Sequence, residues 1–317
     1  MRPLQIVSFF DGRMGHEKQT KGVLQALSRL TPTCIEQKRV EPPNFKNGLK
    51  NWFLYLVSLT APGKDTDRLV DLIIGTGAGT HIPMLLFKKE CKARVVTCMN
   101  PDFFLKRAID LCLVPRHDRQ REGDNILLTV GPPNNVKFEK KHDRGKGLIL
   151  VGGLDPKSHY WRSDTVIAQI RSILEKGRSV IWTISSSPRT PEKTLLQLER
   201  LASGNSRVTF FRSEDTQGGW IEAQYARNDR VWVTADSMSM IFEALTAGCR
   251  VGILPVKWKR SNNKFQKSLN YLFENNLVTP YQSWLEGQRM IAPGVPLDEA
   301  SRCAKEILRR WWPDRLK

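Results

Sequence analysis

Short apolar runs that alternate with longer amphipathic segments are the feature that most constrains the fold of this 317-residue chain. Residues 5–10 (QIVSFF) stop at Asp11, and residues 17–30 then carry apolar side chains at helical spacing. The same order returns at residues 69–89, where glycines separate a strand-like run from a helical one. Two more strand-like runs lie at residues 94–98 and 109–114. Strands that alternate with helices predict βαβ units and a parallel sheet.

A polar stretch at residues 132–146 (PPNNVKFEKKHDRGK) interrupts this pattern and is typical of a linker between domains. Beyond it the alternation begins again. Further strand-like runs lie at residues 147–151, 179–184, 207–211, 230–233 and 251–255. We therefore predict an α/β protein of two doubly wound, Rossmann-like domains. The first spans residues 1–140 and the second residues 147–301, and a final helix at about residues 302–317 is expected to pack back on the first.

The composition excludes several classes of protein. Hydrophobic residues make up 40% of the chain, which is enough for packed cores and argues against disorder. No apolar run reaches the roughly 18 residues of a membrane-spanning helix, and the N-terminal segment lacks the pattern of a signal peptide. The six cysteines have neither CxxC nor zinc spacing, so we expect a cytoplasmic, reducing environment. The net charge of +18, spread along the chain, favours anionic ligands or surfaces.

Two glycine-rich loops follow predicted strands in the first domain. Open α/β sheets bind ligands at the carboxyl ends of their strands, where such loops lead into helix N-termini. The first loop holds Gly12, Gly15 and His16. The imidazole is a candidate general base or oxyanion-orienting group, and the alternative is a histidine that only packs at a helix start. The second loop holds Gly77 and Gly79, which either approach a ligand or only permit tight strand–helix packing.

Two further loops follow predicted strands in the second domain. Gly152 and Gly153 are candidates to cradle a pyrophosphate, the alternative being a tight turn. In the other loop, serines and acids surround the start of an apolar helix. Its candidate donor-binding residues are Asp236, Ser237, Ser239 and Glu243. The serines would cap the helix and face phosphate, and the glutamate, one turn beyond Ser239, would accept ribose hydroxyls. The alternative is ordinary helix-start chemistry.

Four segments, in this order along the chain, resemble one known family. They read DGRMGHEKQ, IIGTGAGTHIP, ILVGG and VTADSMSMIFEALTAGCRVGILPV, and as ordered blocks they cover most of both domains. They are similar to bacterial relatives of the plant mitochondrial-fission (Elm-type) protein, a family regarded as glycosyltransferases. The resemblance implies a GT-B fold, in which two Rossmann-like domains face a central cleft.

The last of these segments also resembles the donor-binding stretch of the peptidoglycan N-acetylglucosaminyltransferases. That resemblance implies phosphate contacts for Ser237 and Ser239 and a ribose contact for Glu243. It also matches His16 to the histidine that ends the glycine-rich loop of those enzymes. The preceding loop, DTQGGW, departs from the Asn-Pro-Tyr type of those enzymes. Its Trp220 is a candidate donor contact, but the departure leaves the base of the donor open.

Together these features predict an enzyme that moves a sugar from a nucleotide-sugar donor to a glycan or lipid acceptor of the cell envelope, such as lipopolysaccharide. His16 is the expected general base, and Asp11 on the same loop is the other candidate. One of Lys257, Lys259, Arg260 and Lys264 would neutralise the pyrophosphate, unless their basic loop is only solvated, and Lys264 is the candidate donor-binding residue among them. No cofactor beyond the donor, no metal and no nucleic acid are expected. The alternatives are a non-catalytic scaffold that recruits protein partners, and a nucleotide-sugar epimerase.

Two remaining segments have a functional and a structural interpretation. Asp65 and Asp67 form a DxD motif, but they precede an apolar strand instead of following one, so we expect no metal there. Residues 52–59 are apolar or aromatic except for one serine. They predict either a buried helix or an interfacial helix with Trp52 and Tyr55 at the headgroup level of an anionic inner membrane.

Overall fold

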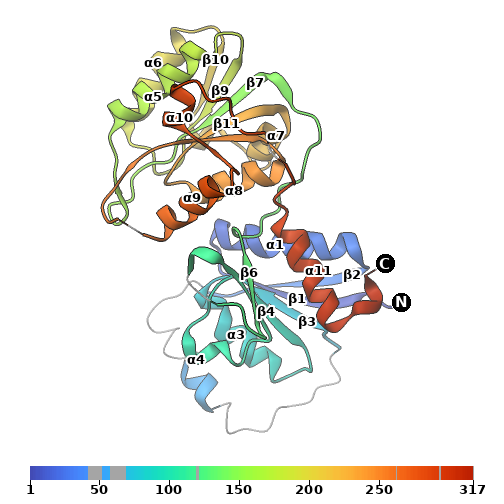
Figure 1. Cartoon of the computed structure of the whole chain (residues 1–317). Helices are drawn as coiled ribbons and strands as arrows, with labels where there is room; N and C mark the ends of the chain where they lie inside the picture. The colour runs from blue at the N-terminus through green and yellow to red at the C-terminus, as the bar shows by residue number, and fades with distance from the viewer. Residues whose placement is uncertain (42–51, 58–68, 119–120, 262, 293, 317) are drawn as a thin grey trace. The chain divides into compact units, whose positions relative to one another are not determined.

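The structure, a computed structural model, describes residues 1–41, 52–57, 69–118, 121–261, 263–292 and 294–316. The chain forms two compact units, one of Met1–Asn135 with Asp298–Lys317 and one of Val136–Leu297 (Figure 1). Each unit is built on its own parallel sheet of six strands. The predicted α/β class with two Rossmann-like domains is therefore confirmed.

The boundaries of the units differ from those expected from the sequence. Residues of the expected linker belong to the second unit, where strand β7 (Asp143–Leu150) begins earlier than predicted. The Glu139 amide also donates to the Ala247 carbonyl at 3.0 Å, which ties the linker to that unit. The last helix, α11 (Glu299–Trp311), lies in the first unit and packs on α1 (Met14–Leu30).

The sheet of the first unit has the strand order β2-β1-β3-β4-β5-β6. Its strands are β1 (Leu4–Phe10), β2 (Thr33–Arg39), β3 (Leu72–Gly75), β4 (Arg94–Thr97), β5 (Leu111–Pro115) and β6 (Ile126–Thr129). Its other helices are α3 (Ala78–Lys88), α4 (Phe103–Lys106) and the short η1 (Arg116–Asp118) and η3 (Pro313–Arg315). Helices α1 and α11 cover one face of the sheet, and α3 and α4 pack on the other. Most strands are buried on both faces, which explains why they are continuous apolar runs.

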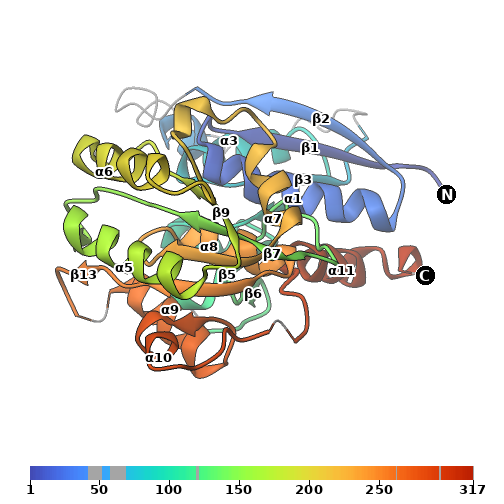
Figure 2. The ribbon, with the colours of Figure 1, turned by 90° about the horizontal axis from the view of Figure 1, so that it is seen from above.

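The sheet of the second unit has the order β10-β9-β7-β11-β12-β14. Its strands besides β7 are β9 (Ile181–Ser185), β10 (Val208–Phe211), β11 (Asn228–Thr234), β12 (Arg250–Leu254) and β14 (Thr279–Pro280). Its helices are α5 (Ser163–Lys176), α6 (Glu192–Ser203), η2 (Ser213–Asp215), α7 (Trp220–Arg227), α8 (Met238–Ala247), α9 (Lys264–Glu274) and α10 (Tyr281–Leu285). Helix α5 lies beside α6 on one face of the sheet (Figure 2). Helix α7 packs against β7 and β11, and α8 packs against β11 and β12. A separate antiparallel pair joins β8 (His159–Tyr160) to β13 (Lys257–Trp258).

Each sheet reverses its winding at one pair of strands. In the first unit the chain runs from β1 outward to β2 and then returns to place β3 on the other side of β1. In the second unit it runs from β7 to β9 and β10, and then returns to place β11 beside β7. Ligands of open α/β sheets bind at the carboxyl ends of the two strands that flank such a reversal. The fold therefore directs attention to the loops after β1 and β3, and after β7 and β11.

The described part of the predicted membrane segment is a short helix at residues 52–57. Tyr55 is buried and Trp52 half-buried in the core beside α3, so the expectation that these two rings lie at headgroup level is wrong. Phe53 and Leu56 are exposed instead, because they lie on the other side of the helix. The Asp65 and Asp67 motif lies outside the described residues. No described helix has the length and apolar character needed to cross a bilayer.

Candidate functional site

The candidate catalytic pair lies where β1 ends in the first unit. Asp11 follows the strand directly and is buried, and His16 stands in the first turn of α1 with 25% of its side chain exposed. His16 Nδ1 and Asp11 Oδ2 are 2.7 Å apart, which is a hydrogen-bond distance. Asp11 Oδ1 accepts from the Arg13 amide at 3.1 Å. Both carboxylate oxygens are therefore engaged, and the imidazole presents Nε2 as its remaining nitrogen.

Gly77 approaches this pair from the loop after β3. Its φ is +109°, and a Cβ at this position would lie 2.3 Å from Asp11 Oδ2 and 2.5 Å from His16 Nδ1. Only glycine fits there, because both the backbone angle and the space exclude a side chain. The other glycines predicted for these loops are Gly12, Gly15 and Gly79. A Cβ added at Gly12 or Gly15 would meet no atom within 4 Å, so space does not require glycine there. Gly79 lies in the first turn of α3.

A buried histidine lies close to the same loops. His81, on α3, places Nε2 3.0 Å from Thr97 Oγ1, and its Nδ1 has no hydrogen-bond partner among the described residues. Burial lowers the pKa of His81 to about 4, against a raising effect of Asp102 and with a further lowering by His16. The ring is therefore neutral at pH 7. The structure thus adds an uncharged imidazole near the candidate pair.

In the second unit, Asp236 connects the loops after β7 and β11. Its Oδ2 accepts from the Gly153 amide at 3.1 Å and from Arg189 Nη2 at 2.9 Å. The Gly152 amide donates to Thr234 Oγ1 at 2.8 Å. These two glycine amides therefore donate to side chains of the protein and are not free to donate to a phosphate. This corrects the expectation that Gly152 and Gly153 cradle a pyrophosphate with their amides.

The two glycines are nevertheless required by close packing. A Cβ at Gly152 would lie 2.2 Å from Asp236 Oδ2 and 2.4 Å from Ser237 Oγ. A Cβ at Gly153 would lie 2.0 Å from the Arg189 carbonyl oxygen. The absence of side chains at both positions lets the loop that carries Arg189 come against the end of β7. The tight-turn interpretation of these glycines is the one that agrees with the structure.

One oxygen of Asp236 is left without a donor. The residue is buried, and its Oδ1 has no hydrogen-bond partner among the described residues. Buried polar atoms in proteins almost always have a partner, so this buried carboxylate oxygen is an exception among the described residues. Arg189 beside it keeps 43% of its side chain exposed. The loops after β9 and β11 therefore combine a buried carboxylate with a solvent-accessible cation.

The helix that follows Asp236 differs in part from the expectation. Ser237 occupies the N-cap of α8 but makes no side-chain cap bond, because its hydroxyl donates to Asp236 Oδ2 at 3.3 Å. Ser239 is exposed. Glu243 is buried and contacts the hydroxyl of Tyr225, whose pKa is raised well above its ordinary value by burial first and by this carboxylate second. The carboxylate of Glu243 thus faces Tyr225 of α7, and its expected contact with a ribose stays a prediction.

Two predicted donor contacts lie apart from the hydrogen bonds around Asp236. Trp220 begins α7, and its ring centroid lies 5.1 Å from that of Phe211. Lys264 is exposed at the start of α9, with Nζ 5.3 Å from the ring centroid of Phe265. No group of three or more metal-ligating side chains occurs among the described residues. The bonded network of the second unit therefore centres on Asp236.

A family model described as "Mitochondrial fission ELM1" matches residues 14–311 of the chain. The chain belongs to the mitochondrial fission ELM1 family. This confirms the resemblance seen in the four ordered segments. No curated protein sequence matches the chain. The ELM1 family model spans both units, and it includes His16 and the loops after β3, β7, β9 and β11 but not Asp11.

Solved structures with the same fold include UDP-GlcNAc 2-epimerases. The one from Neisseria meningitidis bound to UDP-GlcNAc is 12% identical, with a TM-score of 0.53 over 98% of this chain and 100% of its own. The one from Methanocaldococcus jannaschii is 12% identical, with a TM-score of 0.52 over 97% and 100%. The S. aureus MnaA–UDP structure is 11% identical, with a TM-score of 0.50 over 96% and 97%. At this identity the likeness describes the fold, which is that of the two-domain GT-B class.

Sequence reasoning did not single out two residues that the structure adds to this ELM1-family chain. Arg189 follows the serine run at the end of β9. Its contact with Asp236 could not be predicted from the sequence, because it depends on the strand order that brings the two loops together. His81 lies within the quoted IIGTGAGTHIP segment, but its burial depends on the packing of α3. A cation just beyond a serine-rich strand end was the available signal for Arg189.

Proposed function

We propose that this protein transfers a sugar from a nucleotide-sugar donor to an acceptor hydroxyl. The observation that carries the proposal is the 2.7 Å contact between His16 Nδ1 and Asp11 Oδ2 at the reversal of the first sheet. A carboxylate that accepts the Nδ1 proton fixes the tautomer in which Nε2 is a base. Nε2 then takes the proton of the acceptor hydroxyl while its oxygen forms the bond to the anomeric carbon. The bond from that carbon to the diphosphate breaks, and its electron pair leaves with the nucleoside diphosphate.

The proposed donor site is the loop region around Asp236 in the second unit. Arg189 supplies a positive charge to the diphosphate, and Asp236 positions this guanidinium by accepting from Arg189 Nη2 at 2.9 Å. Ser237 and Ser239 stand at the start of α8, where the first amides have no partner within the helix and favour phosphate. These roles agree with the general binding place of doubly wound sheets. No cofactor or metal is part of the proposal.

We expect the protein to bind at least one nucleoside diphosphate, and Arg189→Gln to weaken that binding about tenfold or more, because a charge-assisted hydrogen bond to phosphate is lost. Calorimetry with UDP, GDP, ADP and dTDP measures this. Lys264→Gln is the matched control, since it removes the cation expected from the sequence. Circular dichroism verifies that Arg189→Gln remains folded after Asp236 has lost its ion-pair partner.

The assignment is refuted if none of these nucleotides binds, or if folded Arg189→Gln binds as tightly as the unchanged protein. A larger loss of nucleotide affinity in Lys264→Gln than in Arg189→Gln would assign the diphosphate site to the start of α9 instead. An epimerase would use the same donor site but would invert a centre of the sugar without an acceptor. A scaffold that recruits protein partners would bind no nucleotide at all.

The proposed acceptor is a glycan or lipid of the cell envelope, reached from an anionic membrane surface. The support is α4, where Phe103 and Phe104 are 78% and 80% exposed while Leu105 anchors the turn in the core. Arg107 follows them and is also exposed. Exposed aromatic rings beside a cation are typical of contact with anionic lipid.

We expect Phe103→Ser combined with Phe104→Ser to reduce binding to vesicles that contain phosphatidylglycerol. The physical reason is the loss of about 2 kcal/mol or more of apolar transfer free energy for each ring. Vesicle flotation at low and high salt measures the bound fraction, and salt should weaken binding of the +18 chain. Leu196→Ser changes an exposed apolar residue of the second unit and is the control. Equal flotation of all three proteins, or none, would contradict membrane docking by α4.

A further inference from the structure

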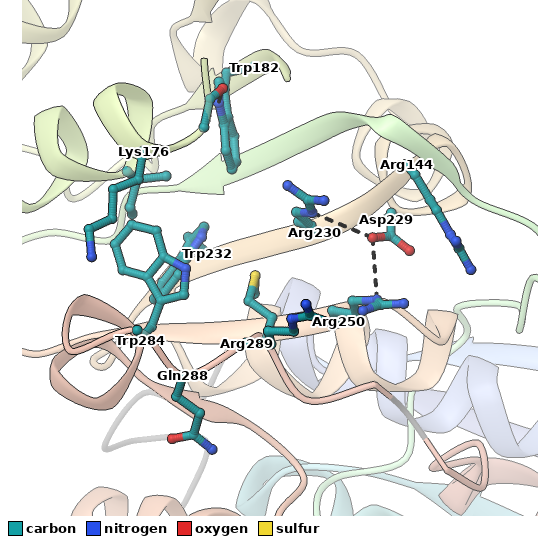
Figure 3. Close-up of a pocket in the computed structure, with 14 residues that line it drawn as sticks. Arg144, Lys176, Trp182, Asp229, Arg230, Trp232, Arg250, Trp284, Gln288 and Arg289 are labelled. Atoms are coloured by element: carbon teal, nitrogen blue, oxygen red, sulfur yellow. Dashed lines mark hydrogen bonds and ion pairs between the residues drawn. The ribbon is translucent and has the colours of Figure 1, made fainter. Parts of the chain in front are cut away.

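The second unit contains a large pocket at the amino ends of its strands, the opposite end of the sheet from Asp236. Arg144 lies at the start of β7, Arg230 near the start of β11, and Arg250 is the first residue of β12. Since the strands are parallel, their amino ends share one edge. The cavity measures about 490 Å³, which is the size of a small-molecule site. Figure 3 shows its lining residues.

Positive charge converges on this pocket with little to balance it. Its cations are Arg144, Lys176, Arg230, Arg250 and Arg289. The one carboxylate that lines it is Asp229, whose Oδ2 is 3.4 Å from Arg250 Nε and 3.7 Å from Arg230 Nε (Figure 3). Arg144 and Arg289 have no ion-pair partner within the described part of the chain. Like charges that converge without a counter-charge raise the free energy of the folded state, and an anion relieves this.

Three tryptophans form the apolar wall of the same pocket. Trp182 and Trp232 are buried, and Trp284 is half-buried. The ring centroids of Trp232 and Trp284 lie 4.9 Å apart in an edge-to-face arrangement, and Trp182 Nε1 donates to the Gly177 carbonyl at 3.3 Å. These contacts hold the rings in place before any ligand arrives. Trp284, held by the buried ring of Trp232, therefore offers an apolar surface to the body of a ligand, and the cations face its charged group.

The basic surface continues beyond this pocket. An adjoining cavity of about 500 Å³ shares Arg144, Asp229 and Arg250 and is also lined by Lys140, Lys141 and His142. Guanidinium groups match the oxygens of phosphate in a bidentate manner, and several of them together suit a dianion better than a single carboxylate. The size and the aromatic wall suit a ligand with one compact ring.

We propose that this pocket binds a sugar phosphate, with the phosphate on Arg144, Arg230, Arg250 and Arg289 and the ring against Trp284. The site is separate from the proposed donor site, since Asp236 lies beyond the carboxyl end of β11 while Arg230 lies near its start. The inference is independent of the proposed catalysis.

The test is calorimetry of the full chain with glucose 1-phosphate, glucose 6-phosphate and mannose 1-phosphate, beside uncharged glucose and inorganic phosphate. We expect at least one sugar phosphate to bind more tightly than inorganic phosphate, and glucose not to bind. Arg144→Gln combined with Arg289→Gln should weaken that binding about tenfold or more, because phosphate contacts are lost. These two arginines hold no ion pair in the described structure, so the fold should tolerate the change.

Two control variants determine whether the loss of binding is specific to this pocket. Arg171→Gln combined with Arg200→Gln removes the same charge from exposed positions on α5 and α6 and should leave binding unchanged. Arg189→Gln alters the proposed donor site and should also leave it unchanged. The proposal is overturned if no sugar phosphate binds, if the Arg144 and Arg289 variant binds normally, or if either control weakens binding to the same extent.

Discussion

We expect His16→Ala to lower the rate of sugar transfer by roughly a hundredfold to ten-thousandfold, the usual effect of removing a general base. The imidazole is held by Asp11 on one nitrogen, which leaves Nε2 for the acceptor proton. Nucleotide binding should persist, because the proposed donor residues belong to the other unit. Release of nucleoside diphosphate from a nucleotide sugar, with an envelope extract as acceptor, measures the rate.

The control for His16→Ala is Gly15→Ala on the preceding residue. A Cβ at Gly15 meets no atom within 4 Å, and alanine suits the first turn of α1, so activity should be retained. Asp11→Asn should also reduce the rate, since it removes the carboxylate that fixes the histidine tautomer. Near-normal turnover in His16→Ala would contradict this mechanism. The remaining alternatives would then be Asp11 as the general base, or a non-catalytic scaffold.

The second large effect is expected from Gly153→Ala, which should lower the free energy of unfolding by about 3 kcal/mol, at the upper end of typical overpacking costs. The added Cβ would meet the Arg189 carbonyl oxygen at 2.0 Å and the Thr190 amide nitrogen at 2.5 Å. Both are backbone atoms, so relief requires the whole loop to move away from β7. Nucleotide binding should fall with it, because this loop carries Arg189.

Urea unfolding followed by circular dichroism measures the stability change in Gly153→Ala. Gly218→Ala is the matched control, since a Cβ there meets no atom within 4 Å. Equal stability of the two variants would show that the loop with Arg189 does not pack on Gly153 as the structure describes, and the account of the donor site would lose its basis.

The sheets and the loops at their ends were predictable because they depend on local pattern. Apolar runs of strand length mark the buried strands, and glycines after β1, β3 and β7 mark where they end. Parallel strands place their carboxyl ends at one edge, so topology brings together the loops after β1 and β3, which the sequence indicated as two separate loops. The hydrogen bond between Asp11 and His16 was not predicted, since a spacing of five residues in a loop does not define a contact.

The donor-side details depend on long-range packing that local pattern does not contain. Glu243 lies one helical turn from Ser239, which suggested a shared exposed face, but α7 brings Tyr225 against that glutamate. Likewise, the open amides expected at Gly152 and Gly153 are bonded to residues more than 80 positions away in sequence. The basic pocket gathers residues from β7, β11, β12 and the segment after α10, and no motif links them.

The chemical identity of the products tests the central claim most directly. The full chain is incubated with the nucleotide sugar whose diphosphate binds best and with an envelope extract, and mass spectrometry follows both the donor and the acceptor. The account predicts that nucleoside diphosphate accumulates while an acceptor gains the mass of one sugar residue, and that His16→Ala abolishes most of both. A donor that stays intact, or one converted only to its epimer with no acceptor modified, would contradict it.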